Sequence, residues 1–443
     1  MRENLRAFEV NHRSVIAIAW PTTLAYLSTP LLGLIDTGVV GRLGDPALLG
    51  GLAVGAILFD IIFTTFNFLR SSTTGLVAQS LGAGRDEEQR VVLIRSLILS
   101  VAMGLVILVL APFISTMGLW AMDVSEAVEN ATLAYFSIRV LAAPLTLINY
   151  SVLGWMLGLG QARLGLALQF VLNGSNIVLS IWLGLIWEWG IEGVAWATVI
   201  AEALAACVGL AIAWYRLSGL GKVSWPTVFG KTALLRLFGV NRDIMIRSFC
   251  LLFAFAFFTA QGANYGEVTL AANAVLMNFF LISGYFLDGF ATAAEQLAGK
   301  AVGAKYRPAF NSAVRLTLIW GYLLSIVASL IFWIAGPWVI DLLTTNEAVR
   351  LVARDYLIWA ALTAIVGVMA FQMDGVYIGA TWSADMRNMM LLSLLAFLLT
   401  WWIATPMLQN HGLWLSLEVF LGIRGISLYM RLPRKAEETF SPA

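Results

Sequence analysis

The sequence is poor in charged residues. Only 12% of its 443 residues are Asp, Glu, Lys or Arg, against about 25% in soluble domains, and 60% are hydrophobic. A soluble core would not absorb this much apolar surface, so the composition favours a protein embedded in lipid. The net charge of +1 gives no basis for binding nucleic acid, and we expect no such partner.

The sequence also has only two cysteines and two histidines. Cys207 and Cys250 lie in apolar segments, where we expect buried, inert thiols rather than a disulfide or a metal site. His12 and His411 lie near segment ends, and neither a His/Cys/Asp cluster nor a Gly-x-Ser motif with a paired His is visible. A membrane-embedded enzyme is therefore disfavoured, and we expect no catalytic residue, no bound metal and no cofactor.

Most of the sequence consists of long apolar segments. A membrane-spanning helix needs about 20 apolar residues, and twelve segments meet that test. They lie near residues 14–38, 50–80, 92–116, 128–157, 164–186, 191–215, 243–264, 270–299, 312–335, 353–379, 387–408 and 411–430. We predict an all-α integral membrane protein with 12 transmembrane helices, the first being too long for a cleaved signal peptide.

Lys and Arg are distributed unevenly over the loops. Twenty of the 27 lie at the two termini and in one set of alternate loops, whereas the other set holds only Arg42, Arg350 and Arg354. Because cytoplasmic loops keep the positive charge, both termini are predicted to be cytoplasmic. The expected location is a bacterial-type cytoplasmic (inner) membrane, crossed many times.

The chain repeats itself at a spacing of 221 residues. This shift places Tyr135 on Tyr356, and Gly154-x-x-x-Gly158 on Gly375-x-x-x-Gly379, a pattern of small residues that lets helices approach closely. We predict a six-helix bundle at 1–215, a cytoplasmic linker at 216–242 and a second six-helix bundle at 243–443, related by a pseudo-two-fold axis along the membrane normal. Parallel repeats of this kind favour an alternating-access transporter over a channel, for which no filter sequence is visible.

Asp36 is the most informative polar residue. It is the only charged residue among the 28 positions between Arg13 and Arg42, and its place in the run predicts the outer half of the membrane. An ionisable group inside a span costs about 2.5–3.5 kcal/mol on insertion scales and is by default a functional candidate. Other polar residues are predicted at the same depth, forming a ring and a substrate pocket around Asp36: Tyr135, Asn173, Asn176, Ser180 and Thr198. For each one alone, an interhelical hydrogen bond is the alternative.

Two prolines lie on the same predicted helix as Asp36. A proline inside a helix removes a backbone hydrogen bond and lowers the resistance to bending. Pro21 is the predicted hinge, at which the helix bends when Asp36 changes its protonation state, and a static kink at Pro21 or Pro30 is the alternative.

The second half carries its ionisable residues elsewhere. Asp288 and Asp374 are predicted in the cytoplasmic half, where they can pair with Arg247 or Arg70, and a role in ion coupling is the second interpretation. The 221-residue shift places Phe257 opposite Asp36, so the first half is expected to hold the single carboxylate near the outer face.

Four stretches together resemble a known family. They are Pro30-Leu-Leu-Gly-Leu-Ile-Asp36-Thr, Leu69-Arg-Ser-Ser-Thr-Thr-Gly75, Tyr285-Phe-Leu-Asp-Gly-Phe290 and Asp374-Gly-Val-Tyr-Ile-Gly-Ala-Thr381. With Pro21, they are similar to the DinF branch of the multidrug and toxin extrusion (MATE) transporters over nearly the whole chain. The resemblance implies a V-shaped pair of bundles that exports amphipathic, often cationic compounds in exchange for inward H+ or Na+.

The resemblance also assigns roles to residues. Asp36 matches the first-helix aspartate that takes up the coupling ion, with Tyr135, Asn176 and Thr198 around it. Relatives often carry a second aspartate where this chain has Ser180, which favours H+ coupling over a Na+ site at Asp36, Asn176 and Thr198. We expect a monomer in the lipid bilayer that moves small amphipathic substrates, with a Na+-coupled exporter or a lipid-type flippase as alternatives.

Overall fold

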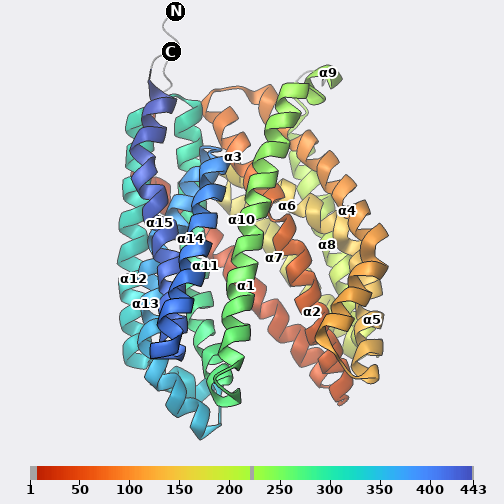
Figure 1. Cartoon of the computed structure of the whole chain (residues 1–443). Helices are drawn as coiled ribbons and strands as arrows, with labels where there is room; N and C mark the ends of the chain where they lie inside the picture. The colour runs from red at the N-terminus through yellow and green to blue at the C-terminus, as the bar shows by residue number, and fades with distance from the viewer. Residues whose placement is uncertain (1–6, 220–223, 442–443) are drawn as a thin grey trace, which may run out of the picture. The chain divides into compact units, whose positions relative to one another are not determined.

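The computed structural model describes residues 7–219 and 224–441, which form helices joined by short loops and contain no β-strand (Figure 1). In chain order the helices of the first half are α1 (His12–Gly41), α2 (Pro46–Phe66), α3 (Phe68–Gly82), α4 (Asp86–Met122), α5 (Glu126–Arg139), the 3-10 turn η1 (Val140–Ala142), α6 (Ala143–Gly158), α7 (Ala162–Ile181), the π-helical turn η2 (Trp182–Ile186) and α8 (Gly190–Leu217). The remaining helices are α9 (Trp225–Val228), α10 (Lys231–Ala263), α11 (Glu267–Gly303), α12 (Arg307–Leu343), α13 (Glu347–Gly379), α14 (Ser383–Leu408) and α15 (Asn410–Phe440).

The described residues contain 12 helical segments long and apolar enough to cross a membrane. Each coincides with one of the twelve predicted segments, which confirms the all-α membrane fold. All twelve run longer than predicted; the third spans Asp86–Met122, for example. The second is interrupted at Asn67, where α2 ends and α3 begins.

Local sequence explains several helix starts. Asp45 caps α2 by accepting a hydrogen bond from the backbone N–H of Ala47 at 2.8 Å, and Pro46 occupies the first turn. Asn346 caps α13 in the same way through the N–H of Val349. These caps hold the turns that reverse the chain between neighbouring spans.

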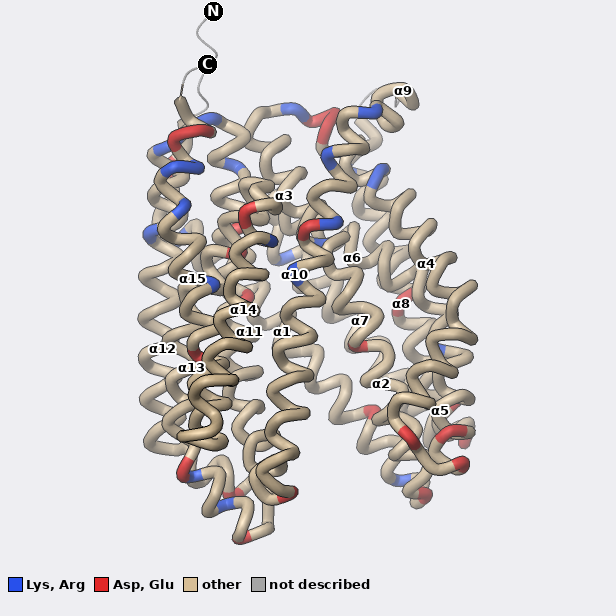
Figure 2. Tube along the Cα trace, viewed as in Figure 1, with Lys and Arg blue, Asp and Glu red and all other residues tan. Residues whose placement is uncertain are grey.

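The helices present apolar side chains to their surroundings as well as to each other. On α4, Val109 is 79% and Trp120 77% exposed, and only 22% of the most apolar part of this span is buried. Such faces suit hydrocarbon rather than water. In Figure 2 the charged residues gather toward the helix ends, as spanning helices require.

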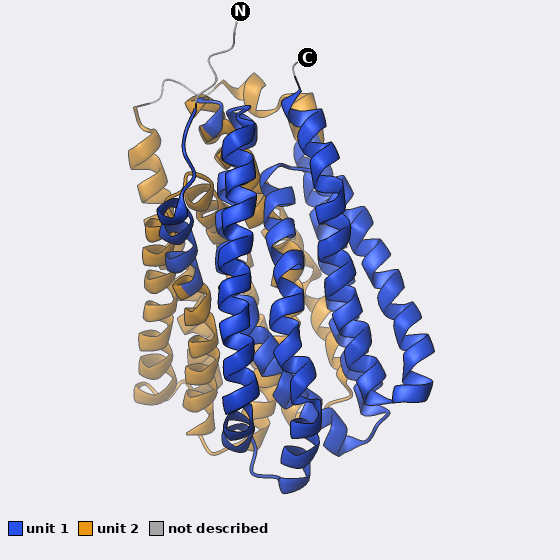
Figure 3. Cartoon of the chain, turned by 90° about the vertical axis from the view of Figure 1, so that its left-hand side faces the viewer, with its two compact units in different colours: residues 1–23, 82–84, 236–443 blue, residues 24–81, 85–235 orange. Residues whose placement is uncertain are grey.

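The described chain divides into two compact units (Figure 3). Of the described residues, unit 1 comprises 7–23, 82–84 and 236–441, and unit 2 comprises 24–81, 85–219 and 224–235. The division falls inside α1, between Thr23 and Leu24. Part of the predicted linker 216–242 is helical, as α9 and the start of α10, and its residues 220–223 lie outside the described part.

Among the close helix contacts at glycines, one in each unit forms a pair related by 221 residues. In unit 2, a side chain at Gly154 of α6 would overlap the carbonyl oxygen of Arg70 on α3. In unit 1, a side chain at Gly375 of α13 would overlap the carbonyl oxygen of Ala291 on α11. The partners Arg70 and Ala291 are themselves 221 residues apart, so the predicted repeat register is confirmed in three dimensions.

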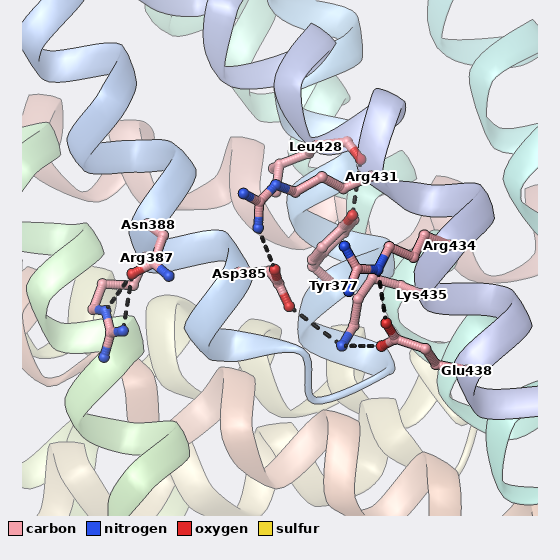
Figure 4. Close-up of polar contacts among 9 residues, drawn as sticks. All are labelled: Tyr377, Asp385, Arg387, Asn388, Leu428, Arg431, Arg434, Lys435 and Glu438. Atoms are coloured by element: carbon pink, nitrogen blue, oxygen red, sulfur yellow. Dashed lines mark hydrogen bonds and ion pairs between the residues drawn. The ribbon is translucent and has the colours of Figure 1, made fainter.

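Ion pairs tie together one end of unit 1 (Figure 4). Asp385, at the start of α14, binds Arg431 at 2.7 Å and Lys435 at 3.4 Å, both on α15, and Tyr377 of α13 donates its hydroxyl to the carbonyl of Leu428. These side chains come from three helices, so they fix the ends of α13, α14 and α15 relative to one another.

Candidate functional site

A cavity of about 250 Å³ lies within unit 2. Its walls come from α1, α2, α5, α6, α7 and α8 and from η1, with apolar, aromatic and polar side chains mixed. The lining residues are Thr29, Leu32, Asp60, Phe63, Thr64, Arg139, Ala142, Thr146, Asn149, Tyr150, Gln169, Leu172, Asn173, Asn176, Thr198 and Glu202. Pockets for drug-sized ligands usually measure about 300–1,000 Å³, so this cavity is below the size that encloses such a molecule.

Three charged side chains face this cavity. Asp60 comes from α2, Arg139 from the end of α5 and Glu202 from α8. The sequence-based prediction did not include Asp60, Arg139 or Glu202 among the site residues. The signal was present, because Arg139 and Glu202 follow the predicted residues Tyr135 and Thr198 by four positions, which is one helical turn on the same face.

Arg139 links the aromatic and acidic parts of the site. Its guanidinium donates a 2.7 Å hydrogen bond to the hydroxyl of Tyr135 and lies 4.5 Å from the ring centre of Phe59. Its positive charge acts on the carboxylates of Asp36, Asp60 and Glu202. One cation thus stands among three acidic groups without forming a close ion pair with any of them in the described structure.

Glu202 is held by α6. The side-chain N–H of Asn149 donates to its carboxylate oxygen at 2.6 Å and to its backbone carbonyl at 3.0 Å. These bonds fix a buried acid at the cavity wall. When Asp60 and Glu202 are both ionised, they and Arg139 give the cavity lining a net charge of one negative unit. Such a lining suits a ligand with a positive charge and an apolar body.

Asp36 lies at the start of a chain of hydrogen bonds that leads to the cavity wall. Its Oδ1 is 2.8 Å from the hydroxyl of Ser180, and that hydroxyl is 3.0 Å from Oδ1 of Asn176. Nδ2 of Asn176 donates to the hydroxyl of Thr198 at 3.0 Å, and Thr198 donates to the carbonyl of Val194. The spacing of four residues between Asn176 and Ser180 on α7 places both on the side of α1.

The other predicted site residues take different partners. Asn173 donates to the hydroxyl of Ser28 on α1 at 2.6 Å, so it is bonded to the helix of Asp36 but not to Asp36 itself. Asn173, Asn176 and Thr198 line the cavity, whereas Asp36, Ser180 and Tyr135 are buried outside its lining. The predicted ring is therefore a chain that connects Asp36 to the cavity.

In unit 1, Asp374 is buried between two arginines. Arg247 of α10 and Arg424 of α15 both donate to its carboxylate oxygen Oδ2. The pair with Arg247 matches the sequence-based expectation, while Arg424 was not foreseen. Asp288 acts electrostatically on Arg424. The cluster holds α10, α13 and α15 together, as expected of a structural ion pair.

Unit 1 contains a buried acid that the sequence-based prediction did not include. Glu418 of α15 is only 7% exposed and lies eight residues from the helix start at Asn410, about 12 Å along the axis. Asp36 lies five residues from the end of α1 at Gly41, about 8 Å along its axis. The charge count predicts that both of these helix ends face outward, so each half is predicted to carry a buried acid near that side, against the expectation of a single one in the first half.

Comparisons with known proteins identify the family. A model of the MatE family matches residues 21–182 and 244–403. The chain is 38% identical over 417 residues to the DNA damage-inducible protein F of Escherichia coli, covering 93% of this chain and 90% of that protein. It is 23% identical over 449 residues to a probable multidrug resistance protein NorM of Bacillus cereus, covering 96% of each.

The fold matches as well. A solved structure described as MATE in the bent conformation superimposes with a TM-score of 0.87 at 17% identity, covering 96% of both chains. Since the family model covers both halves and a relative above 30% identity spans nearly the whole length, the chain belongs to the MatE family of membrane transporters.

Proposed function

We propose that this transporter exports amphipathic, commonly cationic compounds in exchange for inward H+, with Asp36 as the residue that takes up the proton. Family membership supports export, because relatives include proteins described as multidrug resistance proteins. The choice of H+ as the coupling ion rests on the hydrogen bonds around Asp36, namely on how many donor hydrogens the bonded side chains supply.

Ser180 has one hydroxyl hydrogen but two acceptor neighbours. The carboxylate of Asp36 and Oδ1 of Asn176 lie at 2.8 and 3.0 Å from the same hydroxyl oxygen, and a hydroxyl donates only one hydrogen bond. Both contacts are satisfied if Asp36 carries a proton and donates it to Ser180, which then donates to Asn176. The arrangement is complete for a protonated Asp36.

The same four side chains can serve the ionised state. If the amide of Asn176 turns over, its N–H donates to Ser180, Ser180 donates to the Asp36 carboxylate, and Thr198 donates to the amide oxygen. Loss of the proton therefore reverses the direction of the chain without breaking it. Because Asn176 and Thr198 line the cavity, the reversal changes whether the wall presents donors or acceptors.

The chemistry of the cavity lining suits substrates of the proposed class. Its aromatic residues Phe63 and Tyr150 suit an apolar body, and its two acidic side chains against one arginine suit a cation. Protonation of Asp36 removes one negative charge from this region and weakens attraction for a cationic substrate. Proton and substrate would then compete, as exchange requires.

The first helix supports movement near Pro21. Pro21 lies within α1 and has no N–H for the carbonyl of Ala17, so the helix resists bending less at this point. The division between the two units falls two residues later, between Thr23 and Leu24. We propose that α1 bends here when Asp36 takes up a proton, which reduces the cavity and expels substrate. The protein would act as a monomer in the cytoplasmic membrane, with both termini in the cytoplasm.

Transport in proteoliposomes tests the proposal. Vesicles loaded with ethidium would be given an H+ gradient or, separately, a Na+ gradient. We expect ethidium movement with the H+ gradient, none with the Na+ gradient alone, and loss of the H+-driven movement in Asp36→Asn. Movement driven by Na+ would show Na+ coupling, and equal rates in Asp36→Asn would overturn the role of Asp36.

A further inference from the structure

Glu418 is an acidic residue without a polar partner inside unit 1. Both of its carboxylate oxygens are buried, and neither has a hydrogen-bond partner among the described residues. Asp36 differs, because Ser180 is within hydrogen-bonding distance of its carboxylate. An ionised carboxylate buried without donors or a counter-charge is very costly, and in practice such a group takes up a proton.

The surroundings of Glu418 are apolar. One turn before it, Trp414 packs in a buried cluster with Leu417, Phe420 and Leu421 of the same helix and with Phe397 of α14. The helices that pack against α15 have no Asp, Glu, Lys or Arg in long middle segments, namely residues 268–287 of α11, 356–373 of α13 and 388–408 of α14. Residues 248–263 of α10, whose Phe258 contacts Trp414, have none either.

The titratable groups that face this region are few and lie toward the helix ends. On α15, His411 lies seven residues before Glu418, and Arg424 lies six residues after it in the cluster with Asp374 and Arg247. Cys250 belongs to the apolar cluster, and Tyr265 and Tyr356 pack against it. Further along the neighbouring helices lie Asp355 and Tyr377 of α13 and Tyr285, Asp288 and Glu295 of α11. Arg424 and Arg247 both bind Asp374, and neither forms an ion pair with Glu418 among the described residues.

A column of polar side chains leads from the nearer end of α15 toward Glu418. Asn410 and Asn273 exchange hydrogen bonds at 2.8 and 2.9 Å, and Trp414 donates to Asn273 at 2.9 Å. Asn410, Trp414 and Glu418 follow one another at intervals of four residues, so they lie on one side of the helix. The acid is thus one turn below a buried polar cluster that begins at the helix end.

We propose that Glu418 is a second proton-binding site, which holds a proton in the conformation described here and exchanges it at the predicted outer side during transport. The site takes H+ and no larger cation, since a single carboxylate in an apolar cluster offers no further ligands for a metal ion. This second site is additional to the role proposed for Asp36. With two sites, two protons rather than one are expected to enter for each monovalent cation exported.

The test counts protons and substrate in the same vesicles. A pH dye inside the proteoliposomes reports H+ movement while ethidium efflux is followed. Glu418→Gln, which mimics the protonated acid, is expected to lower the ratio of H+ to ethidium to about half. Glu437→Gln, the same change at an exposed position on the same helix, should keep the wild-type ratio. An unchanged ratio in Glu418→Gln would overturn the proposal.

Infrared spectroscopy reads the proton directly and does not depend on transport. At neutral pH the wild type should show a neutral carboxyl band that Glu418→Gln lacks and that Asp36→Asn retains. If Glu418→Gln does not fold, Glu418→Asp keeps an acid at the site and should shift this band. No change in the carboxyl region for either variant contradicts the proposal, whereas failure of Asp36→Asn to alter transport contradicts only the role of Asp36.

Discussion

Ser180 occupies the middle of the hydrogen-bond chain that connects Asp36 to the cavity. Its hydroxyl is the only described group bonded to the Asp36 carboxylate, and it also contacts Asn176. Whichever way the chain points, both neighbours depend on this one hydroxyl. The coupling proposed for Asp36 therefore requires Ser180 as its positioning residue.

Ser180→Ala removes both bonds without adding bulk. A hydrogen bond to a charged group contributes about 1.5–3 kcal/mol, so we expect H+-driven efflux to fall about tenfold or more. The control is Ser175→Ala on the same helix, where the hydroxyl bonds only to carbonyls of its own helix. Equal efflux from the two variants would contradict the proposed chain.

Arg139 is expected to set how much positive charge a substrate needs. Arg139→Gln leaves Asp60 and Glu202 with no cation at the cavity. The efflux of a substrate with two positive charges should therefore rise relative to that of a substrate with one. Efflux of propidium, a dication, would be compared with that of ethidium, a monocation. A parallel loss of both, or the same result with Arg163→Gln at an exposed position on α7, would contradict this role.

The residues of the site differ in how far the sequence predicts them. Asp36 stands out as the only charge in a long apolar run, and Asn176 and Ser180 share a helical face by their spacing. Glu202 carries the same signal as Asp36, an acid inside an apolar span, and the same rule would have found it. Its bond to Asn149 was not predictable, because it depends on how α6 packs against α8.

At the scale of helices, the paired glycine crossings explain why the two halves share one register. Gly154→Leu in unit 2 and Gly375→Leu in unit 1 would each force apart two helices whose backbones are in contact. Overpacking of this kind costs about 1–3 kcal/mol, so both variants should lower the thermal unfolding temperature in detergent. Gly239→Leu is the control, because a side chain there meets nothing within 4 Å, and an equal loss in all three would contradict the account.

The bending of α1 is tested by restoring its missing backbone hydrogen bond. Pro21→Ala supplies an N–H for the carbonyl of Ala17, so α1 should become stiffer and efflux slower, while the stability of the protein is unchanged or higher. Pro337→Ala, inside α12 of unit 1, is the matched change in another spanning helix. If only Pro337→Ala slows efflux, the hinge does not lie at Pro21.

At the scale of the helices, the sequence predicted all twelve spans and the glycine repeat, because hydrophobic length and small-residue spacing are local properties. The interruption at Asn67 between α2 and α3 and the π-helical turn at Trp182–Ile186 were not predicted. Both depend on how neighbouring turns pack, and the pattern of hydrophobic residues in the sequence does not show this packing.

For the whole molecule, the structure gives the two units different polar interiors on the same helical plan. Unit 2 holds the cavity and the chain from Asp36, whereas unit 1 holds the arginine-bound Asp374 and the isolated Glu418. The repeat fixes where backbones meet, and the side chains carried on that shared backbone give each unit its own set of buried polar groups. Comparing the sequence with itself located the repeat but did not point to Glu418. The 221-residue shift places Phe257 of α10 opposite Asp36, whereas Glu418 lies on α15.

The most direct test of the central claim measures protons released when substrate binds. Ethidium would be added to purified, detergent-solubilised protein in weakly buffered solution, and the pH change recorded with a dye. If the Asp36 proton competes with the substrate, the wild type should release protons on binding, and Asp36→Asn should bind ethidium while releasing fewer. The same release from Asp36→Asn as from the wild type would contradict the account.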